Sequence, residues 1–136
     1  MDSTDKIVVE AAATALRAFI RVISLPDDKI GIEISKDAKL EKLQKAFDIA
    51  TRIEEKKLIL SRLEANRTLN SLNFAVKCAS NPDLAEDAYE AIAEHAHDGW
   101  LRQQHVAEFA SAMELVVNNS KNKELVERVK RYQTQK

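Results

Sequence analysis

The chain has few residues that interrupt a helix, with two glycines and two prolines in 136 residues. Cysteine is limited to Cys78, so an internal disulfide is excluded. The small apolar neighbours of this thiol, Ala75, Val76 and Ala79, predict that it is buried. No apolar run is long enough to span a membrane, and the N-terminus lacks the cationic region of a signal peptide. We therefore expect a soluble, helical chain that does not insert into membranes.

An excess of positive charge is also lacking, because 21 Lys and Arg accompany 22 Asp and Glu and the net charge is -1. Domains that bind duplex nucleic acid usually carry a clear excess of cations, so this class is disfavoured. A helical scaffold that cradles a duplex through backbone charge stays open as an alternative. With 45% hydrophobic and 32% charged residues, the composition is typical of a globular chain, and residues 1–136 are expected to form one domain.

Apolar residues recur at helical spacing along most of the chain, and turn residues separate the periodic segments. The run 29–34 alternates apolar and polar residues but has no second run to pair with, so an extended loop is expected there. Asn81 followed by Pro82 is the clearest helix start signal. The pattern predicts about seven helices, over 5–25, 35–51, 54–65, 68–78, 81–98, 100–117 and 122–132.

The periodicity also predicts which side chains face inward. On the helix over 81–98 the inward stripe is expected to contain Leu84, Ala88, Ala91 and Ile92. On the helix over 100–117 it is expected to contain Val106, Phe109, Ala110, Met113 and Val117. Glu124 and Arg128, four residues apart on the last helix, are expected to form a solvent-exposed ion pair.

Three segments carry a resemblance to a known family: 25–28 (Leu-Pro-Asp-Asp), 54–63 (Glu-Glu-Lys-Lys-Leu-Ile-Leu-Ser-Arg-Leu) and 81–93, which begins Asn-Pro-Asp-Leu. From about Ala11 to Ala96 the chain resembles the HEAT-like helical-repeat modules of bacterial multidomain proteins. The resemblance implies an all-α fold of antiparallel helices stacked as a HEAT/armadillo-like α-α superhelix. It also implies a docking or spacer module without chemistry of its own, carried in exported proteins beside sugar-acting hydrolase-type or haem-binding domains. From Gly99 onward no motif of the family is present.

The three histidines lie close together in the sequence as His95, His97 and His105, with carboxylates nearby. Imidazoles and carboxylates are the ligands that zinc or iron prefers, so a small metal-dependent enzyme centred on these residues is an alternative. Residues two apart on a helix point about 200° apart, which argues against His95 and His97 sharing one ion. His95 continues the inward stripe of its helix and is expected to be a partly buried, hydrogen-bonded side chain.

The sequence contains no Gly-rich phosphate loop, nucleophile elbow, His-Glu-x-x-His pair or Cys-x-x-Cys motif. We therefore expect a non-enzymatic scaffold without cofactor or metal, which binds a protein partner or a neighbouring domain of its parent chain. The candidate contacts are polar residues on the helix over 68–78 and an aromatic residue after the Gly99 turn: Asn70, Asn73, Lys77 and Trp100. For Trp100 two interpretations compete, an exposed aromatic platform and a ring that covers the end of the preceding helix.

Overall fold

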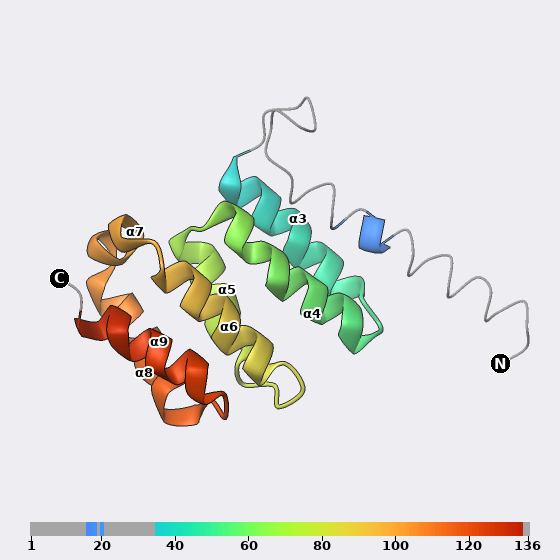
Figure 1. Ribbon diagram of the computed structural model, residues 1–136. Helices are drawn as coiled ribbons and strands as arrows, with labels where there is room; N and C mark the ends of the chain where they lie inside the picture. The colour runs from blue at the N-terminus through green and yellow to red at the C-terminus, as the bar shows by residue number, and fades with distance from the viewer. Residues whose placement is uncertain (1–15, 19, 21–34, 135–136) are drawn as a thin grey trace, which may run out of the picture. The chain divides into compact units, whose positions relative to one another are not determined.

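The computed structural model describes residues 16–18, 20 and 35–134 (Figure 1). All regular elements within these ranges are helical, and none of the described residues lies in a strand. The predicted all-α class is confirmed. The loop predicted over 29–34 and most of the helix predicted over 5–25 lie outside the described residues. The elements are α3 (Lys36–Ile49), α4 (Ile53–Arg62), the 3-10 helix η1 (Leu63–Asn66), α5 (Leu69–Cys78), α6 (Ala85–Ala96), α7 (Gly99–Gln104), α8 (Val106–Asn119) and α9 (Lys123–Thr134).

The chain divides into two compact units, Met1–Asn66 and Arg67–Lys136, and the single domain stays a prediction. In the first unit α3 packs against α4 and η1. Ser35 caps α3 by accepting a hydrogen bond from the Ala38 amide, as expected for a serine at this position. The core of the unit consists of fully or nearly fully buried apolar side chains: Ile20, Leu40, Leu43, Ile59, Leu60 and Leu63.

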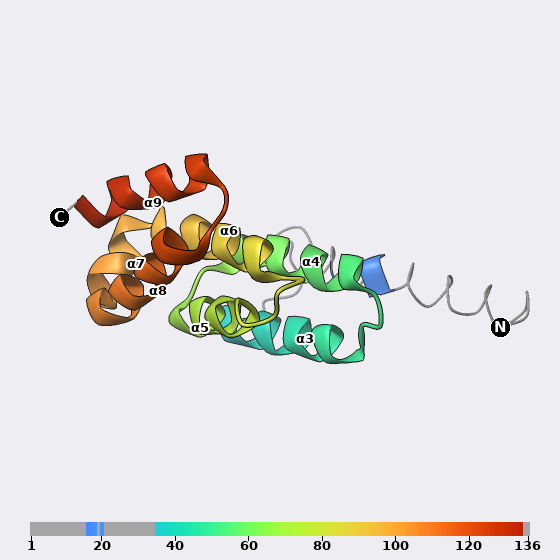
Figure 2. The same ribbon diagram turned by 90° about the horizontal axis from the view of Figure 1, so that it is seen from below.

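In the second unit α6 is the central helix, because it packs against α5, α7, α8 and α9. Figure 2 shows α6 beside α5 from a second direction. The inward stripe predicted for this helix is confirmed, since Leu84, Ala88, Ala91 and Ile92 are all at most 5% exposed. Several of these side chains are alanines, and small residues allow neighbouring helices to approach closely. The buried faces of α5, α8 and α9 close this core with Leu72, Ala75, Phe109, Val116 and Val129.

The predicted start of the helix over 81–98 is wrong by a turn. Asn81 does not cap the helix, because its side-chain oxygen accepts from the Asp83 amide, while the Leu84 amide donates to the Asn81 carbonyl. These bonds close a separate turn around Pro82, and α6 begins only at Ala85. Asparagine side chains stabilise such turns as well as they cap helices, so the same residues favoured two local structures.

The helix predicted over 100–117 is interrupted at His105, whose backbone angles of φ -137 and ψ 54 are not helical. The interruption separates the short α7, capped by Asp98 through the Leu101 amide, from α8. The inward stripe of α8 is also displaced from the predicted one, toward Ala112 and Val116. Phe109 and Met113 are buried as predicted, but Val106 is 67% exposed and Ala110 is exposed as well, so the prediction that these two face inward is wrong.

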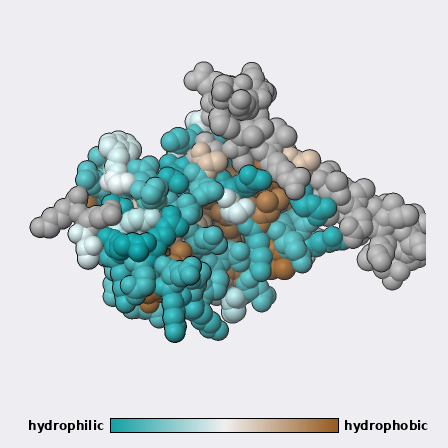
Figure 3. Space-filling view, viewed as in Figure 1, coloured by the Kyte–Doolittle hydropathy of each residue, from teal (hydrophilic) through white to brown (hydrophobic). Residues whose placement is uncertain are grey.

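The described surface seen in Figure 3 is mostly hydrophilic, with apolar residues in small patches. Among the described helices none is both long enough and apolar enough to cross a bilayer.

Candidate functional site

The three histidines occupy different environments in the second unit. His95 on α6 is completely buried, His97 at the end of α6 is exposed, and His105 lies at the break between α7 and α8. The expectation that His95 and His97 point in different directions is confirmed. Among the described residues no three His, Cys, Asp or Glu side chains are grouped so that they could hold a metal ion.

His95 joins α6 to the start of α5 through hydrogen bonds at both ring nitrogens. Its Nδ1 lies 2.7 Å from the Ala91 carbonyl oxygen, and its Nε2 lies 2.6 Å from Ser71 Oγ. A carbonyl can only accept, so in the neutral ring Nδ1 carries the proton and Nε2 accepts from the Ser71 hydroxyl. Ser71 also completes a capping box with Thr68, whose side chain accepts from the Ser71 amide. The predicted hydrogen-bonded histidine is thus confirmed, and its burial is complete where the sequence predicted partial burial.

This serine and histidine have the donor order of a nucleophile and its general base. Both are buried, however, with 1% of Ser71 and none of His95 exposed, and burial this complete closes the hydroxyl to a substrate. Burial also lowers the pKa of His95 from 6.5 to about 4, because the charged ring would lose its hydration. The pair is therefore a buried hydrogen bond that connects α5 and α6.

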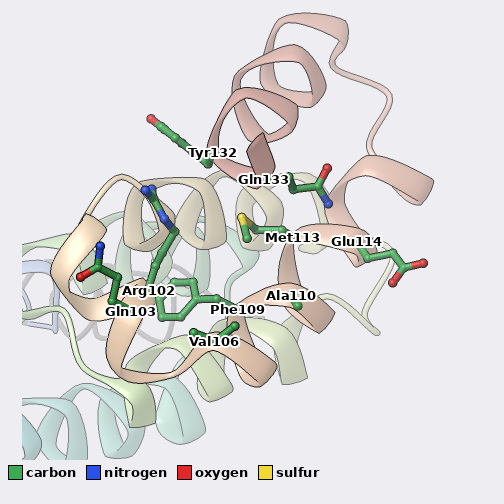
Figure 4. A pocket seen from close by; sticks show the side chains of 9 residues that line it. All are labelled: Arg102, Gln103, Val106, Phe109, Ala110, Met113, Glu114, Tyr132 and Gln133. Carbon is green, nitrogen blue, oxygen red and sulfur yellow. The ribbon is translucent and has the colours of Figure 1, made fainter. Parts of the chain in front are cut away.

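An open groove of about 460 Å3 lies along α8, between α7 and the last turn of α9 (Figure 4). We call it the α8 groove. Phe109 and Met113 form its buried floor, while the exposed Val106 and Ala110 lie along its edge. In the view of Figure 4, Arg102 lies at one end and Glu114 at the other. The complete lining is Arg102, Gln103, Val106, Phe109, Ala110, Met113, Glu114, Tyr132 and Gln133.

One wall of the α8 groove is fixed by Tyr132 on α9. Arg128 donates from Nε to the Tyr132 hydroxyl at 2.7 Å, and its Nη1 pairs with Glu94 on α6 at 2.8 Å. The hydrogen bond to Glu94 raises the pKa of Arg128. The Arg102 guanidinium, which also donates to the Ala96 carbonyl, lies 5.3 Å from the centre of the Tyr132 ring. These contacts fasten the last turn of α9 to its neighbours.

This arrangement corrects the ion pair predicted within α9. Arg128 does not pair with Glu124 four residues before it; it reaches across to α6 and binds Glu94. Glu94 on α6 is partly buried, whereas Glu124 lies on the exposed face of α9. An ion pair with a partly buried partner is less screened by water than an exposed pair within one helix. Sequence spacing alone describes only the partners on the same helix.

The sequence-predicted contact residues lie on two elements. Asn70, Asn73 and Lys77 are exposed on α5, and none of them lines the α8 groove. Trp100 on α7 is 69% exposed, so most of the residue faces solvent, and its role as an aromatic platform stays a prediction. Sequence reasoning missed the α8 groove, because it assigned Val106 and Ala110 to the core.

Compared with family models, with curated proteins and with solved structures, the chain has no significant match to any of them. Helices packed against one another agree with the sequence resemblance to HEAT-like modules only at the level of an all-helical fold.

Proposed function

We propose that this chain is a non-enzymatic, HEAT-like helical-repeat module that binds a segment of a protein partner, or of a neighbouring domain of its parent chain, in the α8 groove. The observation that carries this proposal is Val106, which is 67% exposed at the edge of a groove whose floor is Phe109. Apolar side chains that border a concave surface are typical of binding sites, whereas single scattered ones are ordinary surface.

The contacts around the groove support the same function. Its floor belongs to the core of the unit, so Phe109 and Met113 are held in place before anything binds. Its α9 wall is fixed by the bonds of Tyr132 and Arg128. A groove that is formed in advance loses little conformational freedom on binding, which favours affinity.

A peptide selection tests this function. A displayed library of short random peptides is selected on the wild-type chain, on Ala110→Lys, and on a variant with Asn70, Asn73 and Lys77 all replaced by Ala. The exposed Ala110 tolerates the long side chain without disturbing the core, and the lysine fills the groove.

Peptides enriched on the wild type are expected to lose binding to Ala110→Lys and to keep it on the triple α5 variant. An enrichment that depends on the α5 residues instead would assign binding to the face predicted from sequence, and no enrichment at all would refute an interaction module. Far-UV circular dichroism of each variant shows that the fold is intact.

A further inference from the structure

The charges around the α8 groove indicate what kind of segment it binds, an inference that rests on the proposed function. We propose that the occupant is an amphipathic helix whose apolar stripe is followed at one end by Lys or Arg, and that this cation pairs with Glu114.

The apolar positions follow helical spacing. Val106, Ala110 and Met113 line the groove at intervals of four and three residues along one helix. A helix laid into a groove uses apolar side chains at the same intervals, so its stripe and this row can interlock over two turns. An extended strand, which presents alternate residues, matches this spacing poorly.

The charge of α8 favours a basic partner. Its charged residues, Glu108 and Glu114, are both acidic and both exposed. The positions one turn before and after Glu114 hold Ala110, Ser111, Val117 and Asn118, so no cation on its own helix neutralises it. Among the described residues no ion pair includes Glu114. A cation on a bound segment therefore gains an attraction without displacing an existing partner.

The arginine at the opposite end of the groove is already engaged. The Arg102 guanidinium donates to the Ala96 carbonyl at the end of α6 and lies over the Tyr132 ring. A carboxylate that pulls the guanidinium out of this position would have to break these contacts. We therefore expect Arg102 to attract a carboxylate of the ligand less strongly than Glu114 attracts an ammonium group of the ligand. The site thus prefers a positively charged segment.

Two synthetic peptides provide the probes. Each is an acetylated, amidated amphipathic helix with leucines at the spacing of the groove; one carries a single Lys one turn after the last leucine, and the other carries Glu at that position. Binding is measured by titration calorimetry at low salt. We expect the Lys peptide to bind about threefold more tightly, the range of a solvent-exposed ion pair, and this ratio to shrink as salt is added.

Charge-reversal variants assign the effect to one side chain. In Glu114→Lys the preference is expected to reverse in favour of the Glu peptide. Glu108→Lys, the matched control, makes the same charge change on an exposed α8 position outside the groove and is expected to keep the wild-type preference. Ala110→Lys places a lysine stem across the apolar row and its ammonium group one turn before Glu114, so it is expected to weaken the Lys peptide about tenfold or more.

The outcomes separate the two proposals. Equal binding of both peptides, or an unchanged preference in Glu114→Lys, would overturn the basic occupant while leaving a binding groove in place. Failure of both peptides to bind would overturn the groove as a helix site altogether. Sedimentation of the chain without peptide tests whether a second copy occupies the groove. A wild-type dimer that dissociates in Ala110→Lys would show this and would overturn the basic partner helix.

Discussion

Acid is expected to destabilise the second unit through His95. The ring is fully buried and its pKa is about 4 in the folded chain, against the ordinary histidine value of 6.5. Desolvation is the largest cause; Arg67 also lowers the pKa, whereas the hydrogen bond to Ala91 and the charges of Glu94 and Asp98 raise it. The folded state thus binds the proton more weakly than the unfolded state.

The sign and size of the effect follow from this difference. Above pH 6.5 neither state holds the proton and the contribution of His95 to stability is complete. As the pH falls toward 4, only the unfolded state takes up the proton, so the free energy of unfolding decreases. Each pH unit in this window costs about 1.4 kcal/mol, and the whole window about 3 kcal/mol.

Urea denaturation followed by circular dichroism, at several values between pH 7 and pH 4, measures this decrease. In His95→Gln the acid-dependent loss is expected to be smaller than in the wild type by about 3 kcal/mol. Ser71→Ala is the informative comparison. It removes the hydroxyl that bonds His95 and the Thr68 backbone and costs about 1 to 3 kcal/mol at neutral pH, yet leaves the ring buried and the acid dependence in place. Equal pH dependence of wild type and His95→Gln, or a His95 NMR titration midpoint near 6.5, would refute the reasoning.

Three further predictions concern stability. Phe109→Ala should lower the free energy of unfolding by about 4 kcal/mol, whereas Val106→Ala, one turn away, should change it by less than about 0.5 kcal/mol. Similar losses for both variants in urea denaturation would contradict the burial of Phe109 and the exposure of Val106. Asp98→Ala removes the α7 cap and should cost about 1 kcal/mol by thermal denaturation, while Asp98→Asn should cost much less. Arg128→Met should lose about 1 kcal/mol and increase amide exchange in the last turn of α9; unchanged exchange there would show that the Tyr132 wall does not need Arg128.

The sequence predicted well those features that depend on contacts within one helix. The all-α class, the inward stripe around Ile92 and the burial of His95 all follow from residues three and four apart. Glu41 and Lys45, four residues apart on α3, form an exposed ion pair at 3.5 Å of the kind that this spacing favours. Periodicity reports these features because one turn of helix fixes which side chains are neighbours.

Features that depend on several elements were not predictable in the same way. No Gly or Pro near position 105 marks the break in the helix. The sequence therefore predicts one continuous helix, in which Val106 and Ala110 are wrongly placed on the inward face. Arg128 pairs with Glu94 on another helix, 34 residues away in the sequence. The α8 groove depends on two such features: Val106 and Ala110 are exposed on α8, and Arg128 and Arg102 hold Tyr132 of α9 in place. Local spacing carries no information about either.

After the non-helical backbone at His105, the first turns of α8 place apolar residues on two sides of the helix. Phe109 and Met113 keep the interior filled, while Val106 and Ala110 stand in solvent on the same stretch of chain. Substitutions at the two outer positions therefore meet little packing constraint, so under the proposed function the preference for a partner can diverge without loss of folding. Libraries that randomise Val106 and Ala110 offer a direct way to retarget it.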